Sequence, residues 1–127
     1  MIVLDASTAV AALVLDGSAR EAAAREQLHA PHLIDAEVAQ TLRRLVSAGR
    51  LPARTGDHLV TEWAALALVR HPIHPMLPRI WALRDSLSAY DATYVALAEA
   101  LGCALLTADA RLARAPGATC PVTVVAS

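Results

Sequence analysis

The stretch LSAYDATYVALAEALGCALLTAD, residues 87–109, decides the fold. Its first part predicts a helix over 89–101, because Ser88 is a good N-cap residue and Gly102 a good terminator. The apolar run Cys103–Thr107 follows at once and predicts a strand. This run does not alternate apolar with polar residues, which is typical of a parallel strand covered on both faces. The stretch therefore indicates an α/β fold.

The rest of the chain repeats this succession of short apolar runs and helical patterns. We expect one domain over residues 1–127, with a parallel sheet covered by helices on both faces. Further strands are predicted at 2–5, 32–34, 73–74 and 122–125. Further helices are predicted from Ser7 as N-cap to Leu15, at 18–29, at 36–48, from Pro52 onward, at 79–86 and at 108–114.

Composition narrows the class of protein. The chain is 56% apolar and carries a net charge of −1, so no basic field indicates nucleic-acid binding. No apolar run approaches the roughly 20 residues that span a membrane, and no basic segment precedes the first apolar run, as a signal peptide would require. Cys103 and Cys120 lack metal-type spacing and fit a reduced setting, so we expect a cytoplasmic protein without membrane partners.

Four acids stand where a predicted strand ends or a predicted helix begins. They are Asp5, Glu37, Asp91 and Asp109. In a parallel α/β sheet these places converge on one edge, outside the carboxyl ends of the strands. Carboxylates gathered there repel one another, and a bound divalent cation relieves the repulsion. The pattern predicts a metal-dependent phosphodiesterase.

Each acid also has a structural interpretation. Asp5 can simply end a strand, and Asp109 can cap the short helix that follows it. Asp91 completes an S-x-x-D capping pattern with Ser88. At 100° per residue, however, Asp91 shares the inward stripe of its helix with Tyr94, where an acid is costly unless it is paired or bound to metal.

Glu37 competes with Asp35. Asp35 is well placed as the N-cap of its helix, which leaves Glu37 in the first turn as an acid favoured by the helix dipole. Periodicity alone favours that structural interpretation of Glu37. Arg44 lies seven residues further on, on the same face and about 10 Å along the helix. It is the candidate phosphate or RNA contact, although a solvated arginine is the simpler interpretation.

Other chemistries lack their motifs. The five histidines show neither H-x-x-x-H nor H-E-x-x-H spacing, which argues against an imidazole zinc site. No G-x-x-x-x-G-K-[ST] loop is present to hold a nucleotide. All eleven basic residues are arginine, so no lysine is available for chemistry that requires one.

Three segments carry a resemblance to a known family. IVLDASTAVAALV at 2–14, DAEVAQTLRRLVSAGRL at 35–51 and LSAYDATYVALAEALGCALLTADARLA at 87–113 resemble PIN-domain proteins, specifically the VapC-type toxins of prokaryotic toxin–antitoxin pairs. The resemblance covers nearly the whole chain. Its last segment is the most specific, because it couples an aspartate-led helix to a strand and a T-x-D element.

The resemblance implies a five-stranded parallel sheet between helices and an acidic pocket that binds Mg²⁺ or Mn²⁺. It assigns Glu37, not Asp35, to that pocket. The implied carboxylates are Asp5, Glu37, Asp91 and Asp109, and the implied supporting hydroxyls are Ser7 and Thr107. One or two ions held there would lower the pKa of a bound water and neutralise charge growing on the phosphate.

The resemblance also implies partners and products. The chain is expected to cleave RNA as an endoribonuclease, to leave a 5′-phosphate and a 3′-hydroxyl, to form a homodimer, and to be silenced by a cognate VapB-type antitoxin. The high apolar fraction fits such partners. We expect surplus apolar surface on the alanine-rich segment 18–29 and on the face of Leu59, Trp63 and Leu66.

Two rival functions are weighed against this one. A receiver-like phosphoacceptor domain has a similar size and an acidic metal pocket, but it depends on a lysine, which this chain lacks. Haloacid-dehalogenase-type phosphatases also use a lysine. In addition, they need a D-x-D motif after the first strand, where this chain has Asp5-Ala-Ser7. A non-catalytic α/β partner-binding domain would use the acids only as helix caps. It predicts no Mn²⁺ affinity and tolerance of Asp91→Asn.

Overall fold

Five short strands form one parallel sheet in the computed structural model, which describes residues 1–126. The order across the sheet is β3-β2-β1-β4-β5, and every neighbouring pair is parallel. The predicted parallel α/β sheet is therefore confirmed. The strands are β1 (Ile2–Leu4), β2 (Leu28–Pro31), β3 (Val69–His71), β4 (Ala104–Thr107) and β5 (Val122–Val124).

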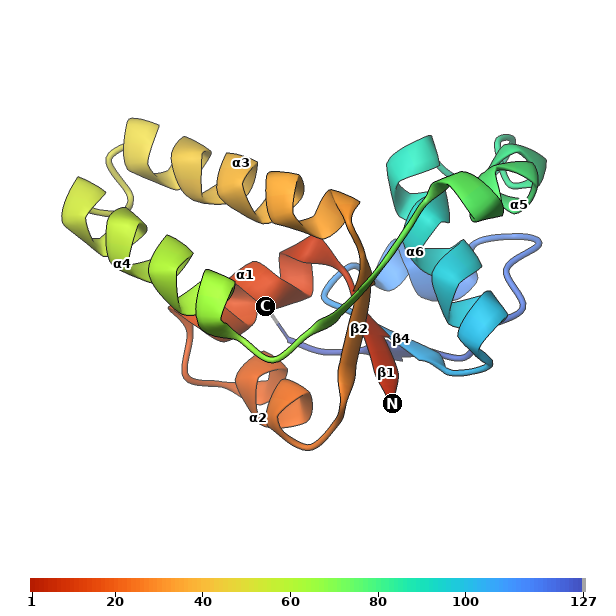
Figure 1. Ribbon diagram of the computed structural model, residues 1–127, viewed down its shortest axis with the longest axis horizontal. Coiled ribbons are helices and arrows are strands. Elements are labelled where there is room, and N and C mark those ends of the chain that lie inside the picture. The colour runs from red at the N-terminus through yellow and green to blue at the C-terminus, as the bar shows by residue number, and fades with distance from the viewer. Residues whose placement is uncertain (127) are drawn as a thin grey trace.

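Helices cover both faces of this sheet. Figure 1 shows α1 to α4 on one side and α5 with α6 on the other, where α6 packs against β1, β2 and β4. The α-helices are α1 (Ala6–Val14), α2 (Ser18–Ala24), α3 (Leu33–Ser47), α4 (Ala53–Ala65), α5 (Leu77–Ala82) and α6 (Ala89–Leu101), and two 3₁₀ helices are η1 (His74–Met76) and η2 (Ala110–Arg114).

The stretch that decides the fold is built as predicted. Ser88 Oγ accepts from the Asp91 backbone N–H at 3.1 Å and starts α6, and Gly102 ends it with a φ of 65°, a left-handed conformation that favours glycine. The strand β4 then runs beside β1, whose three residues are all buried. Within residues 1–126, no helix combines the length and apolar character that crossing a membrane requires.

The region between α2 and α3 was predicted wrongly. The alanine-rich helix ends at Ala24, not at 29, and the strand is Leu28–Pro31, not 32–34. Residues 28 and 29 pair with Ile2 and Val3. The unpaired edge of β1 therefore overrides local helix propensity, because a buried backbone must find hydrogen-bond partners.

Two further predictions are corrected. The short strand lies at Val69–His71, where it pairs with β2, and the predicted 73–74 strand is instead the start of η1. Asp5, not Ser7, is the N-cap of α1, since Asp5 Oδ1 accepts from the Thr8 backbone N–H. A carboxylate that caps a helix and also faces a cavity can serve both purposes, and periodicity cannot reveal this.

The strand order bears on the receiver-like alternative. Doubly wound domains of that size have the order 2-1-3-4-5, with the third strand beside the first. In this chain β3 lies outside β2, at the edge of the sheet. The topology therefore argues against a receiver-like domain, in agreement with the absence of lysine.

Candidate active site

The four predicted acids line a single cavity of about 450 Å³. They reach it from the end of β1, from α3, from the first turn of α6 and from the turn after β4, so segments distant in sequence meet at the carboxyl edge of the sheet. Ser7 and Arg44 also line the cavity. The remaining lining residues are Ala6, Leu33, Ala36, Gln40, Thr41, Tyr90 and Tyr94.

Asp5 is the most firmly held of the acids. It is 6% exposed, and Oδ1 accepts from Ser7 Oγ at 2.9 Å, from Thr8 N at 3.0 Å and from Thr8 Oγ1 at 2.7 Å. Oδ2 accepts a short hydrogen bond from Thr107 Oγ1. An ionised carboxylate oxygen has two lone pairs, so Oδ2 can still bind a further partner. Neutral donors thus fix the Asp5 carboxylate, and none of them is a cation.

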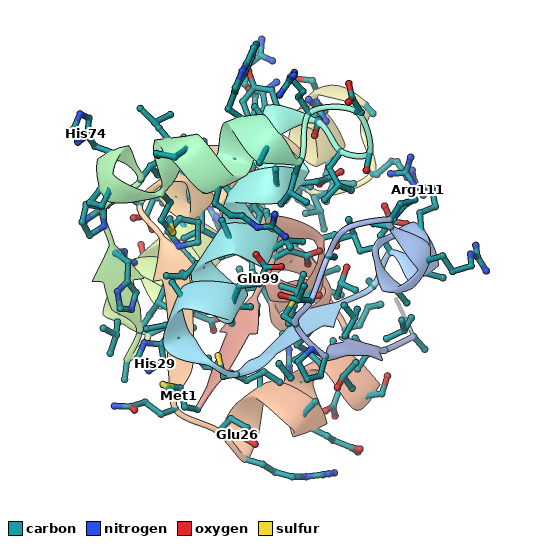
Figure 2. All side chains as sticks on the ribbon, turned by 90° about the vertical axis from the view of Figure 1, so that its right-hand side faces the viewer. Met1, Glu26, His29, His74, Glu99 and Arg111 are labelled. Atoms are coloured by element: carbon teal, nitrogen blue, oxygen red, sulfur yellow. The ribbon has the colours of Figure 1, made fainter. Side chains whose placement is uncertain are left out.

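Asp109 follows β4 and caps η2. Its N–H donates to Thr107 Oγ1 at 2.9 Å, so Thr107 connects Asp109 to Asp5. The Arg111 guanidinium donates to both carboxylate oxygens, at distances of 2.6 to 3.1 Å. These bonds lower the pKa of Asp109. Arg111 itself lies at the periphery of the molecule, 78% exposed (Figure 2), so the ion pair is weak and can open.

Asp91 stands on the cavity side of α6. Burial raises its pKa, and the negative charges of Asp109 and Asp5 contribute to the rise, while Arg111 opposes it. Asp91 therefore shares one cavity with two acids whose charges oppose its ionisation. A group that resists ionisation in a cavity with other acids is typical of a functional site.

Glu37 lies in the second turn of α3, because this helix begins at Leu33 with His32, not Asp35, as its N-cap. Glu37 Oε1 accepts from the Tyr94 hydroxyl at 2.6 Å. The carboxylate therefore connects α3 to α6 across the cavity. Tyr94 is 2% exposed, and burial together with the charge of Glu37 raises its pKa, so its hydroxyl stays protonated.

Asp35 turns away from the cavity. Its oxygens accept from Trp63 Nε1 at 2.7 Å and from the Arg70 guanidinium at 2.7 and 2.9 Å. These bonds, the Arg70 contacts foremost, lower the pKa of Asp35. Asp35 thus joins α3 to α4 and β3, and of the two competing acids only Glu37 faces the cavity.

The donor set fits a hard divalent cation. Every candidate ligand is an oxygen, and Mg²⁺ in proteins is bound by one or two carboxylates and keeps several waters. Within residues 1–126, no three acidic, imidazole or thiol side chains are arranged to hold an ion directly as they stand. The carboxylates of Glu37 and Asp109 are instead engaged by Tyr94 and Arg111. The roles of the four acids as ligands stay predictions.

Two residues of the site were missed by sequence reasoning. The sequence pattern places Tyr94 only on the buried stripe of its helix, and it does not single out Thr8. A signal existed for both, because a buried hydroxyl requires a partner and each lies three residues after an acid of the site. The sequence does not determine the direction in which each hydroxyl group points.

Comparisons with known proteins identify the family of the chain. The family model for the PIN domain matches residues 2–118. A VapC ribonuclease of Mycobacterium bovis, Mb0985, is 55% identical over 125 residues, which cover 98% of each chain. Ribonuclease VapC1 of Mycobacterium tuberculosis is 39% identical over 121 residues, which cover 94% of this chain and 88% of the relative.

Solved structures share the fold of this chain. The crystal structure of PAE2754 from Pyrobaculum aerophilum matches with a TM-score of 0.67 at 26% identity, over 95% of this chain and 81% of that one. The structure of Mycobacterium tuberculosis VapC20, described as a sarcin-ricin loop cleaving toxin, matches with a TM-score of 0.70 at 14% identity, over 94% and 97% of the two chains. At that identity the second match shows the fold alone.

Proposed function

The chain belongs to the PIN-domain family, and from this premise we propose that it is a VapC-type toxin, an endoribonuclease that uses Mg²⁺ or Mn²⁺. The gathering of Asp5, Glu37, Asp91 and Asp109 around one cavity supports the proposal most strongly. Full-length similarity to proteins named VapC ribonucleases supports RNA as the substrate.

The proposed reaction is hydrolysis of a phosphodiester. The oxygen of water attacks phosphorus and the bond to the 3′ oxygen breaks, which leaves a 5′-phosphate and a 3′-hydroxyl. The four acids would hold a divalent cation, which would supply an acidified water and neutralise the charge that grows on the phosphate. Ser7, Thr8 and Thr107 hold Asp5 in place for this task through neutral hydrogen bonds.

Arg44 is the proposed phosphate contact. It lines the cavity from the same face of α3 as Glu37, seven residues further along the helix, and its side chain is exposed. A guanidinium presents paired donors that match phosphate oxygens. With a net charge of −1, the chain has little general attraction for RNA, so contacts of this kind close to the cavity must orient the substrate.

The test is cleavage of total RNA in Mg²⁺ or Mn²⁺ by the wild-type protein, by Asp91→Asn and by Asp35→Asn, followed by mapping of new 5′ ends. We expect discrete cuts by the wild type and by Asp35→Asn, whose carboxylate lies outside the cavity, and none by Asp91→Asn or with EDTA. Ends that ligate without prior phosphorylation would identify water as the nucleophile. Equal behaviour of all three proteins would favour the non-catalytic partner-binding domain.

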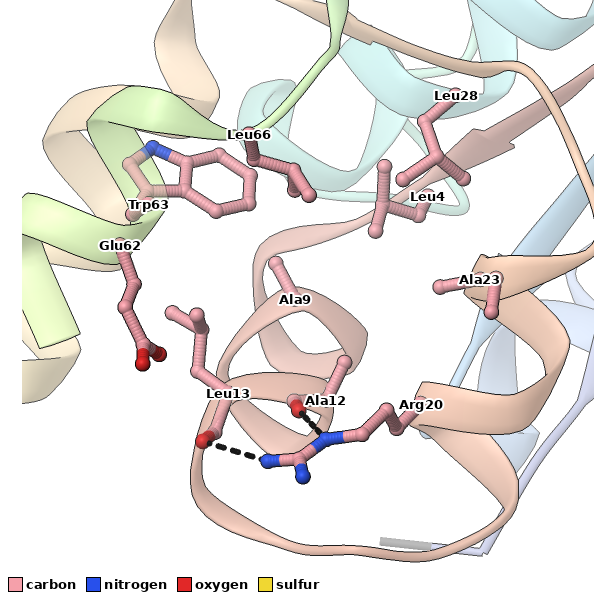
Figure 3. A pocket seen from close by; sticks show the side chains of 11 residues that line it. Leu4, Ala9, Ala12, Leu13, Arg20, Ala23, Leu28, Glu62, Trp63 and Leu66 are labelled. Carbon is pink, nitrogen blue, oxygen red and sulfur yellow. Dashed lines mark hydrogen bonds between the residues drawn. The ribbon is translucent and has the colours of Figure 1, made fainter.

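We also propose that the VapB-type antitoxin binds an apolar groove of about 350 Å³ on the α1–α4 side of the sheet. Figure 3 shows Leu13 of α1 and Leu66 at the end of α4 directed into this space. Of the face predicted as surplus apolar surface, Leu59 and Trp63 are buried in the core and only Leu66 is exposed. Arg20 donates to the carbonyls of Ala12 and Leu13 at 2.8 and 3.1 Å and closes one side of the groove.

Leu66→Glu tests this interface, because the residue is 40% exposed and tolerates a polar side chain without loss of core packing. We expect it to abolish co-purification with the co-expressed antitoxin. The matched control is Val60→Glu, also exposed on α4 but outside the groove. Equal antitoxin recovery with both variants would contradict the assignment.

A homodimer completes the proposal. Exposed apolar side chains on α5, Leu77 at 50% and Trp81 at 68%, support association of two copies. Light scattering at micromolar concentration should give twice the mass of one chain. A strictly monomeric protein would contradict it.

A further inference from the structure

The hydroxyl of Tyr94 makes the one hydrogen bond found for the Glu37 carboxylate within residues 1–126. It donates to Oε1 at 2.6 Å, a length typical of a strong hydrogen bond to an ionised oxygen. The two residues come from α6 and α3, on opposite sides of the acidic cavity that both line. The bond therefore fixes Glu37, on one side of the cavity, to Tyr94 on the other side.

Packing does not account for this hydroxyl. The Tyr94 ring belongs to the apolar core, and a phenylalanine ring would fill the same volume. A buried hydroxyl carries a desolvation cost that phenylalanine would avoid. The tyrosine is thus explained by the acid that its hydroxyl contacts.

We propose that Tyr94 is a positioning residue that fixes the Glu37 side chain so that its second oxygen, Oε2, is presented to a divalent cation. The inference rests on the proposed function. A glutamate side chain has three rotatable bonds. A site that orders these bonds only when the cation binds has a lower affinity for that cation, because the ordering costs conformational entropy. The Tyr94 bond orders Glu37 when the chain folds, before any cation arrives.

The other acids depend less on a single contact. Asp5 is held by three hydroxyls and a backbone N–H, and Asp109 is held as the cap of η2. Asp91 is a short side chain on the rigid helix α6. Glu37 has the longest side chain of the four, so loss of Tyr94 should affect Glu37 most.

The experiment is Mn²⁺ titration by calorimetry of the full chain and of Tyr94→Phe, with Tyr90→Phe as the matched control. Tyr90 lines the same cavity, is 62% exposed, and its hydroxyl bonds to no residue among 1–126. We expect Tyr94→Phe to weaken Mn²⁺ affinity tenfold or more, the usual consequence of removing a group that orients a ligand. Tyr90→Phe should remain within twofold of the wild type.

A double-mutant cycle separates positioning from packing. If Tyr94 acts through the Glu37 carboxylate, Glu37→Gln and Glu37→Gln/Tyr94→Phe should bind Mn²⁺ with equal affinity. RNA cleavage by Tyr94→Phe should also return to the wild-type plateau at high Mn²⁺, with thermal unfolding and far-ultraviolet circular dichroism confirming a folded protein.

The outcomes distinguish the inference from the proposed function. A wild-type protein without Mn²⁺ affinity would overturn both. Wild-type binding with unchanged affinity in Tyr94→Phe, or an equal loss in the Glu37→Gln background, would overturn the inference alone.

Discussion

Glu99, a partly buried residue of α6 labelled in Figure 2, holds the segment before β5 to the rest of the fold. Its carboxylate accepts from the Arg79 guanidinium at 2.7 and 3.0 Å, and from the Thr119 N–H and hydroxyl at 2.7 and 2.8 Å. Arg79 also donates to the Gly117 carbonyl at 2.6 Å. We predict that Glu99→Gln loosens this cluster and destabilises the protein.

The magnitude follows from the pKa of Glu99. Pairing with Arg79, followed by the Thr119 contacts, lowers it from an ordinary 4.5 to about 2. At about 1.4 kcal/mol for each pKa unit, complete pairing would contribute about 3 kcal/mol. Glu99 is 12% exposed but Arg79 is 39% exposed, so solvent screening reduces the expected loss to about 2 kcal/mol.

The sign of the pH dependence is fixed by the lowered pKa. The unfolded chain binds a proton at Glu99 more readily than the folded protein does. The stabilisation is therefore complete above about pH 4.5 and is lost as the pH falls towards about 2. The stability difference between wild type and Glu99→Gln should shrink over the same range.

Urea unfolding followed by tryptophan fluorescence measures this difference, because Trp63 is buried in the folded protein. Titrations at pH 7, 5, 4 and 3 are compared for the wild type, Glu99→Gln and the control Glu21→Gln, an exposed glutamate of α2. A difference below about 0.5 kcal/mol at pH 7, the usual range of surface substitutions, would refute the reasoning. So would a difference that stays constant down to pH 3.

Three further predictions concern the site. Asp91→Asn should raise the melting temperature at pH 7 and abolish Mn²⁺-dependent cleavage, which scanning calorimetry and an RNA assay measure. The melting temperature should rise because the raised pKa of Asp91 means that its ionised form is less stable in the folded protein than in the unfolded chain. Arg111→Ala should strengthen Mn²⁺ binding up to about fivefold in calorimetry by freeing Asp109, and weaker binding would show that Arg111 supports the site. Asp35→Ala should lower the free energy of unfolding, measured in urea, by about 1–2 kcal/mol because it removes the partner of Arg70, and it should leave the Mn²⁺ affinity unchanged. A loss of Mn²⁺ affinity would place Asp35 in the site.

The helix Ala89–Leu101 and the strand after it were predicted almost to the residue, because their signals are local. Ser88 and Gly102 act on the backbone beside them, and an uninterrupted apolar run requires burial on both faces. The strand Leu28–Pro31 could not be predicted in this way. It forms because β1 offers an unpaired edge 26 residues away, and local propensity does not reflect that edge.

The sequence by itself determined the α/β class, the parallel sheet, and the positions of Asp5, Asp91 and Asp109 at strand ends or a helix start, since each depends on residues adjacent in the chain. Only the tertiary structure decided that Thr107 binds Asp5, that Asp35 binds Arg70, and that Tyr94 holds Glu37. A carboxylate takes its role from the donors that face it. Those donors lie up to 102 residues away for Asp5 and 57 for Glu37, and folding alone brings them within hydrogen-bond distance.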